Sequence, residues 1–226
     1  MRPTILLFDV DGTLIRTAGA GRRAIVRALE PHGAGIAAEF SFAGMTDRAI
    51  VRRALETARL EASEARIDAV LAGYLAVLRE EVERAGATYG VHAGMVATLD
   101  AVRGRAGYAV GLGTGNIEAG AHIKLEKVGL RDRFAFGGFG SDAEDRAELL
   151  RVGAERGAAR LRVAVERCRV VVIGDTPKDI AAGRAIGAEC VAVATGSFTP
   201  EQLRPHAPDH VFATLADEGA LETVLG

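Results

Sequence analysis

The stretch TILLFDVDGTL, residues 4–14, is an apolar run that ends in two aspartates and a Gly-Thr turn. Such a run is typical of a strand buried on both faces, as in a parallel sheet. Side chains at positions i and i+2 of a strand point the same way, so we expect Asp9 and Asp11 to project together from its carboxyl end. Open α/β sheets bind ligands at that edge, and two carboxylates so close repel each other unless a cation or a shared proton lies between them. The alternative is structural: Asp9 caps a loop and Asp11-Gly12 is a simple turn.

The composition is that of an ordinary globular protein, with 226 residues of which 49% are hydrophobic and 26% charged. A net charge of -2 argues against nucleic acid or an anionic membrane as the main partner. No apolar stretch approaches the ~20 residues of a membrane span, and no basic-then-apolar signal segment precedes the first predicted strand. We therefore expect a cytoplasmic protein, monomer or homodimer, with no nucleic-acid or membrane partner.

Residues 17–86 differ in character from what precedes them, because they are rich in Ala, Arg, Glu and Leu. They predict helices at 21–30, 46–60 and 63–84. A block of this length is too long for an ordinary crossover connection between strands. The sequence therefore predicts an α/β core domain from residues 1–16 and 87–226, with an inserted all-α cap domain at 17–86.

Strands and helices alternate through the rest of the chain. Alternation of this kind indicates a doubly wound, mainly parallel, Rossmann-like sheet. Ser141 and Glu144 have the spacing of a capping box, which predicts a helix beginning at about residue 143. The predicted strands are 108–112, 134–139, 170–173, 190–194 and 211–212, and the predicted helices between them include 96–103, 117–128, 143–167 and 177–186.

Three of the predicted strands end in polar residues that can bind ligands. The ends of parallel strands meet at one edge of the sheet, so these residues are expected to converge. Carboxylates are the hard ligands that Mg²⁺ prefers, and a hydroxyl beside the N–H groups of a Gly-rich turn suits a phosphate. A divalent cation and an anion in one pocket indicate phosphoryl chemistry. The groups are Asp9 with Asp11, Thr114 with Gly115 and Asn116, and Asp175 with Asp179.

Each group also has a structural interpretation. Thr114, taken alone, is a reasonable helix cap, and Asp175 with Thr176 forms another. The segment GLGTGN, residues 111–116, is superficially similar to a dinucleotide-binding fingerprint, but its third glycine comes one position early. The coincidence of three such strand ends favours a shared site.

The motifs DVDGT at 9–13, TGN at 114–116 and GDTPKD at 174–179, with a helical insertion after the first, resemble the haloacid dehalogenase-like hydrolase superfamily. The resemblance covers essentially the whole chain and is closest to the phosphoglycolate phosphatase-like branch. It implies that Asp9 is a nucleophile that forms an aspartyl-phosphate. It also implies that Asp11 is the general acid that protonates the leaving alcohol and then activates water.

The same resemblance implies a metal site and a phosphate site. Mg²⁺ would bind Asp9, the backbone carbonyl of Asp11 and Asp175, with Asp179 nearby as a ligand or as support for the ligands. Thr114 and the amides of the turn at Gly115 and Asn116 would hold the phosphoryl oxygens.

One feature departs from the family pattern. Relatives carry a phosphate-binding lysine near the position of residues 141–146, where this chain has none. Lys124 is the preferred substitute, because a lysine on the helix after Thr114 is long enough to reach back to the site. Arg146 is the second choice, and the alternative is that Lys124 is a solvated helix lysine. In the cap, Arg48 is a candidate for reading an anionic substrate group.

These features predict a Mg²⁺-dependent phosphatase that hydrolyses a small phosphorylated metabolite, such as phosphoglycolate or a sugar phosphate, through an aspartyl-phosphate. The resemblance implies that Asp11 favours a phosphatase over a dehalogenase, since a halide leaving group needs no proton. A phosphomutase on the same scaffold remains an alternative. A dehalogenase and a non-catalytic phosphate-binding domain are less favoured.

Overall fold

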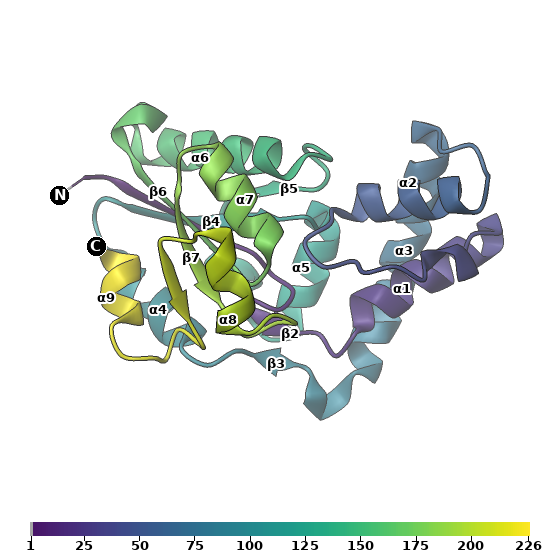
Figure 1. Cartoon of the computed structure of the whole chain (residues 1–226), viewed down its shortest axis with the longest axis horizontal. Helices are drawn as coiled ribbons and strands as arrows, with labels where there is room; N and C mark the ends of the chain where they lie inside the picture. Colours follow the sequence, from purple (N-terminus) through teal and green to yellow (C-terminus); the bar gives the residue numbers. More distant parts are fainter. Residues whose placement is uncertain (1) are drawn as a thin grey trace.

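A six-stranded parallel sheet with the order β5-β4-β1-β6-β7-β8 forms the centre of the computed structural model, which describes residues 2–226 (Figure 1). This arrangement confirms the predicted α/β fold. The residues of β1 are buried along the whole strand, which explains why its sequence is apolar throughout. The strands are β1 (Thr4–Phe8), β4 (Tyr108–Thr114), β5 (Gly137–Phe139), β6 (Arg169–Gly174), β7 (Glu189–Val193) and β8 (His210–Phe212).

The register of the central strands brings three chain segments to one edge of the sheet. Phe8, the last residue of β1, lies opposite Leu112 of β4 and Ile173 of β6. Asp9, Thr114 and Asp175 follow these positions by one or two residues, so the parallel pairing delivers all three to the same edge.

Helices cover both faces of the sheet, because the side chains of β1 alternate between two apolar clusters. Leu6 and Phe8 pack in the cluster that includes residues of α4, α5 and α9, whereas Ile5 and Leu7 pack in the one that includes residues of α6 and α7. The bounds are α4 (Met95–Val102), α5 (Glu118–Glu126), α6 (Arg146–Leu161), α7 (Pro177–Ala185), α8 (Pro200–Leu203) and α9 (Ala220–Leu225). No helix among residues 2–226 is both long and apolar enough to cross a membrane.

A helical insertion leaves the core through β2 (Ile15–Arg16) and returns through β3 (Gly90–Val91), which pair with each other antiparallel. Its helices α1 (Ala20–Leu29), α2 (Asp47–Thr57) and α3 (Glu64–Arg84) lie together beyond the end of the sheet, at the right of Figure 1. The strands β2 and β3 were not expected, because two residues carry no periodic signal. The boundaries at 16/17 and 86/87 remain a prediction. We call residues 17–89 the helical insertion. Short 3₁₀ segments lie at Glu30–His32, Ile36–Ala38, Gly86–Thr88, Arg131–Arg133, Val165–Arg167 and Arg204–His206.

The helix predicted at 143–167 was wrong at both ends. The N-cap is Asp145, whose Oδ1 accepts a hydrogen bond of 2.9 Å from the Glu148 backbone N–H. Asp142 instead accepts from the Phe139 N–H and belongs to the preceding turn. The helix ends before Arg162, which adopts a left-handed conformation with φ of 56°. Arg146 is therefore the first helical residue, next to the sheet edge that carries Asp9.

Candidate active site

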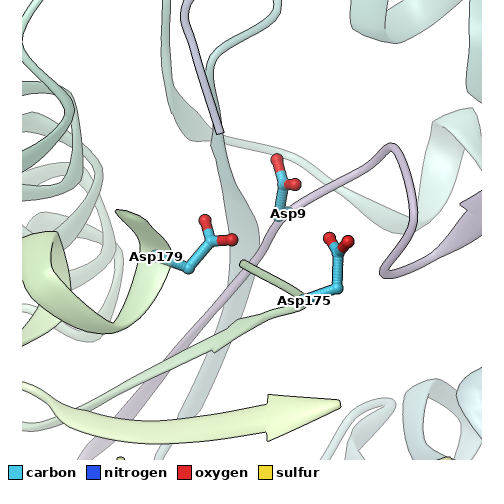
Figure 2. A group of neighbouring side chains, drawn as sticks. All are labelled: Asp9, Asp175 and Asp179. Carbon is cyan, nitrogen blue, oxygen red and sulfur yellow. The ribbon is translucent and has the colours of Figure 1, made fainter. Parts of the chain in front are cut away.

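Three buried carboxylates meet at the carboxyl edge of the sheet, as Figure 2 shows. Asp9 follows β1, Asp175 follows β6, and Asp179 lies in the first turn of α7. One oxygen from each lies within 4.8 Å of the others. The structure therefore brings together residues that are far apart in sequence.

The segment GDTPKD folds into a capped helix start that fixes Asp179. Thr176 is the N-cap of α7, and its backbone N–H and hydroxyl both donate to Asp179 Oδ2, at 2.9 and 2.7 Å. Pro177 occupies the first helical position, where no N–H donor is needed. A Cβ on Gly174 would lie 2.3 Å from Asp179 Cβ, so the close approach requires glycine there.

Asp175 is held on one side by a donor and on the other by glycines. The Thr13 hydroxyl donates to its Oδ1 at 2.9 Å. A Cβ on Gly12 or Gly196 would lie 2.5 or 1.7 Å from its Oδ2. Gly12 also has φ of 83°, a conformation that L side chains rarely adopt. The Asp-Gly-Thr turn thus has a local purpose: it makes room for Asp175 and orients it.

Arg146 is the cation beside the carboxylate cluster. Its Nη2 lies 3.1 Å from Asp9 Oδ1, and its Nε donates to Asp179 Oδ1 at 2.8 Å, with Nη2 donating to the same oxygen. Burial raises the pKa of Asp9 to about 6 although Arg146 opposes the shift, and the charges of Asp179 and Asp11 raise it further. Burial and the neighbouring Asp179 and Asp9 likewise raise the pKa of Asp175 well above its usual value.

This donor set suits a hard divalent cation. Three ionised carboxylates and one guanidinium leave a formal charge of about −2, which a divalent cation balances. A cation bound among these carboxylates would oppose the effects of burial and of the neighbouring carboxylates, which raise the pKa values of Asp9 and Asp175. Both oxygens of Asp179 already accept hydrogen bonds, so Asp9 and Asp175 offer the more available ligand atoms.

Asp11 belongs to a second network. Lys124 Nζ donates to both of its oxygens, at 2.8 and 2.7 Å, and to Asn116 Oδ1 at 2.5 Å. Asn116 Nδ2 donates to Asp11 Oδ2 and to Thr114 Oγ1, at 2.7 and 2.8 Å. Burial works to raise the pKa of Asp11, but Lys124 and Asn116 outweigh it and lower the pKa below its usual value. Lys124 is only 3% exposed, so it is not a solvated helix lysine.

A cavity of about 370 Å³ joins the two networks to the helical insertion. At its rim, the Asp47 N–H donates to the Gly115 carbonyl at 2.8 Å, and Asp47 Oδ2 accepts from the Ile117 N–H at 2.9 Å. A Cβ on Gly115 would lie 2.4 Å from the Met45 carbonyl oxygen. The loop before α2 therefore lies directly against the turn that follows β4.

Most residues singled out from sequence surround this cavity. Those that line it are Asp9, Asp11, Thr114, Gly115, Asn116, Lys124, Arg146 and Asp175. Asp179 is not in the lining, but it accepts a hydrogen bond from Arg146, which is. Arg48 is not in the lining, because its Nη1 donates to Asp68 Oδ1 at 2.6 Å and its Nη2 to Glu64.

Asp47 and Tyr74 are polar cavity residues to which the sequence alone assigned no role. Asp47 follows the N-cap Thr46. It lies in the segment 44–48, which resembles the cap segment that faces the active site in relatives, but that resemblance led only to Arg48. Tyr74 lies at helical spacing from Ile67, Val70, Leu71 and Leu78 of α3, and such an apolar stripe is typical of a core position. No local pattern distinguishes either from its structural interpretation.

Solved structures share this fold at low sequence identity. CbbY from Rhodobacter sphaeroides, in complex with phosphate, superposes with a TM-score of 0.73 at 17% identity, covering 98% of this chain and 100% of that one. A predicted phosphatase from Clostridium acetobutylicum gives 0.71 at 16%, covering 100% and 99%. A putative β-phosphoglucomutase from Bacteroides vulgatus gives 0.67 at 19%, covering 98% and 90%. Identities this low establish the fold alone. A comparison with curated protein sequences found no significant match.

The sequence itself gives a stronger assignment than these superpositions. The family model described as "Hydrolase: haloacid dehalogenase-like hydrolase" matches residues 3–187, a span that includes every carboxylate of the cluster. The family resemblance rests on three sequence motifs, and residues of all three line the cavity at the sheet edge. The chain belongs to the haloacid dehalogenase-like hydrolase family.

Proposed function

We propose that the protein is a Mg²⁺-dependent phosphatase that hydrolyses a small phosphomonoester through an aspartyl-phosphate. The observation that carries the proposal is the separation of Asp9 and Asp11. Although they are two residues apart, Asp9 lies with Arg146 in the acidic cluster and Asp11 is bound by Lys124. Two carboxylates in different environments suit two roles, nucleophile and proton carrier.

In the first step, an Asp9 oxygen attacks phosphorus while the bond from phosphorus to the leaving oxygen breaks. Asp11 gives its proton to that oxygen, and the alcohol leaves. In the second step, Asp11 takes a proton from water as the water oxygen attacks phosphorus, which releases inorganic phosphate and restores Asp9. The contact with Lys124 favours the ionised Asp11 that the second step needs, so the protonated Asp11 of the first step forms against this contact.

The remaining residues bind and orient. Thr114 and the turn that follows it supply donors for the phosphoryl oxygens. Arg146 balances the charge of Asp9, and Asp179 holds the guanidinium in place. Mg²⁺, bound by Asp9, Asp175 and the Asp11 carbonyl, would supply neutralisation of the charge on the transferring phosphoryl group. We assign Arg146, rather than Lys124, as the cation beside the nucleophile Asp9. Lys124 is the cation that contacts the proton carrier, Asp11.

A phosphomutase is the alternative, because the putative β-phosphoglucomutase named above has the same fold. It would return the phosphoryl group to a second hydroxyl instead of to water. Dependence on a sugar bisphosphate distinguishes the two.

The deciding experiment is a phosphomonoester panel assayed for released phosphate, with Mg²⁺ and with chelator. We expect turnover with Mg²⁺, and its loss in Asp9→Asn to below about one thousandth, since the nucleophile is removed. Asp132→Asn, an exposed aspartate far in sequence from the cluster, is the matched control and should turn over normally. A fully active Asp9→Asn protein refutes the proposal.

A further inference from the structure

The hydroxyl of Tyr74 is a buried polar group that has no hydrogen-bond partner among residues 2–226. The side chain is 0% exposed, yet it lines the active-site cavity. Buried polar atoms are nearly always satisfied, so an orphan on a cavity wall points to a ligand or water that completes it. Burial, with the nearby charge of Asp47, raises the pKa of Tyr74 well above its usual value. The phenol therefore stays neutral and can both donate and accept.

Asp47, the first residue of α2, lines the same cavity and lies against the start of α5. Its Oδ2 accepts from the Ile117 N–H, while its Oδ1 has no hydrogen bond to any residue in the described part of the chain. Gly120, one turn further along α5, faces Tyr74, because a Cβ there would be in ordinary van der Waals contact with the phenolic oxygen at 3.5 Å. This end of the cavity thus presents a phenol and an unused carboxylate oxygen. We call these two residues the Tyr74–Asp47 subsite.

The two buried cations of the cavity are already paired with carboxylates. Its lining includes Lys124, Arg146 and Arg22, and no other lysine or arginine. Lys124 has Asp11 and Asn116, and Arg146 has Asp9 and Asp179. Arg22 is exposed, donates to the carbonyls of Phe40 and Ala38, and stacks on a phenylalanine ring. A substrate carboxylate at this end of the cavity would meet Asp47, and both buried cations are already paired with carboxylates.

We propose that the Tyr74–Asp47 subsite binds a hydroxyl of the leaving alcohol, so that the substrates are phosphomonoesters of small polyhydroxy compounds rather than of hydroxy acids. A hydroxyl can donate to Asp47 and exchange a hydrogen bond with Tyr74, whereas a carboxylate is repelled. The cavity of 370 Å³ is near the lower end of the ~300–1,000 Å³ usual for ligand sites, and phosphate and metal fill part of it. The alcohol must therefore be small. The inference rests on the proposed phosphatase function and names its substrate class.

The test compares matched pairs that differ only in CH₂OH against COO⁻. The pairs are 2-hydroxyethyl phosphate with phosphoglycolate, glycerol 3-phosphate with 3-phosphoglycerate, and erythritol 4-phosphate with 4-phosphoerythronate. In at least one pair we expect kcat/KM to be about tenfold or more higher for the alcohol, the size expected for one satisfied buried polar group. Three chain lengths cover the distance between phosphorus and the subsite.

Variants assign the preference to the two residues. Tyr74→Phe should lower kcat/KM for the preferred alcohol about tenfold and leave that for ethyl phosphate, which has no second hydroxyl, within about twofold. Asp47→Asn should reduce the difference in kcat/KM within each pair, because it should raise kcat/KM for the carboxylate substrate. Arg22→Met is the control, and should leave the ratio of kcat/KM values within each pair unchanged. Calorimetric titration of Asp9→Asn with each member of the best pair gives the same ranking without turnover.

The outcomes separate the two proposals. Hydrolysis that favours the carboxylate of every pair, and that weakens in Arg22→Met, overturns the subsite and leaves the phosphatase standing. An unchanged preference in Tyr74→Phe also overturns it. If no ester is hydrolysed and the Asp9→Asn protein binds none, both proposals fall.

Discussion

The guanidinium of Arg146 lies between two buried carboxylates, 3.1 Å from Asp9 Oδ1 and 2.8 Å from Asp179 Oδ1. Removing one partner of such a buried pair leaves uncompensated charge, which costs about 3–5 kcal/mol. We expect Arg146→Met to lose about that much free energy of unfolding in urea without metal, and most of its turnover. Arg146→Lys keeps the charge but not the forked geometry, so it should be intermediate in both.

The control for this prediction is Arg151→Met on the same helix, whose side chain is 53% exposed and forms ion pairs with Glu148 and Glu155 of α6. It should change stability by no more than about 0.5 kcal/mol. Wild-type turnover in Arg146→Met would show that Arg146 has no part in the reaction.

The choice between Lys124 and Arg146 shows where sequence reasoning stops. It depends on where α6 begins, and that start is set by Asp145, which caps the helix in place of the predicted residues near 143. Several neighbouring residues here can cap a helix. Asp142 instead accepts from the Phe139 N–H in the preceding turn and binds Arg156 of α6, which leaves Asp145 as the cap. Local patterns cannot weigh such contacts.

The sheet was predictable because its signals are local. Apolar runs marked the strands, and Thr176 with Pro177 marked the start of α7 as the structure has it. Parallel pairing then brought the strand ends together by general rule. The contacts of Asp47 with Gly115, and the position of Tyr74 in the cavity, arise only when the helical insertion lies against the core. Those contacts have no signature in the sequence.

Metal binding should stabilise the folded protein. At a tenfold excess of free Mg²⁺ over Kd, a cation that binds only the folded state adds about 1.4 kcal/mol. For a chain of this size that corresponds to about 3–5 °C in Tm. We expect this shift in a thermal melt of the wild type and its loss in Asp175→Asn, with Asp132→Asn as control. A full shift in Asp175→Asn would contradict the predicted ligand set.

Asp47 should make stability depend on pH in an unusual direction. Burial raises its pKa to about 6, against the opposing effects of Lys124 and the Ile117 N–H. The folded protein then holds this proton more tightly than the unfolded chain does, so ionisation lowers stability as pH rises from about 4 to about 7.

Asparagine cannot ionise but can still accept from the Ile117 N–H. Asp47→Asn should therefore exceed the wild type in free energy of unfolding by about 1–3 kcal/mol at pH 7.5. The difference should shrink toward zero near pH 4, when urea denaturation is repeated there. The assignment is refuted if the free energy of unfolding of Asp47→Asn, measured relative to the wild type, is lower at pH 7.5 than at pH 4.

Lys124 should matter for turnover because it is the cation that contacts Asp11. Lys124→Met removes the group that stabilises ionised Asp11, and we expect kcat to fall about a hundredfold, within the range for disturbed proton transfer. Lys127→Met is matched in chemistry and lies on the same chain segment, but its ammonium contacts Glu83 at the surface. The measurement compares kcat of Lys124→Met with kcat of Lys127→Met. Equal values would show that Lys124 has no part in the reaction.

Gly115 should control how closely the helical insertion approaches the core. A Cβ there would lie 2.4 Å from the Met45 carbonyl oxygen and 3.0 Å from Arg146 Nη1, so Gly115→Ala must push the loop away. Because the insertion walls the cavity, we expect kcat/KM to fall at least about tenfold, as misplacement of binding groups does. Limited proteolysis should also cut faster within residues 16–20 and 86–94. The control is Gly73→Ala in α3, where nothing lies within 4 Å of the added Cβ, and which should gain up to about 1 kcal/mol of stability. If Gly115→Ala resists protease and turns over like the wild type, the loop contact seen here does not govern access to the site.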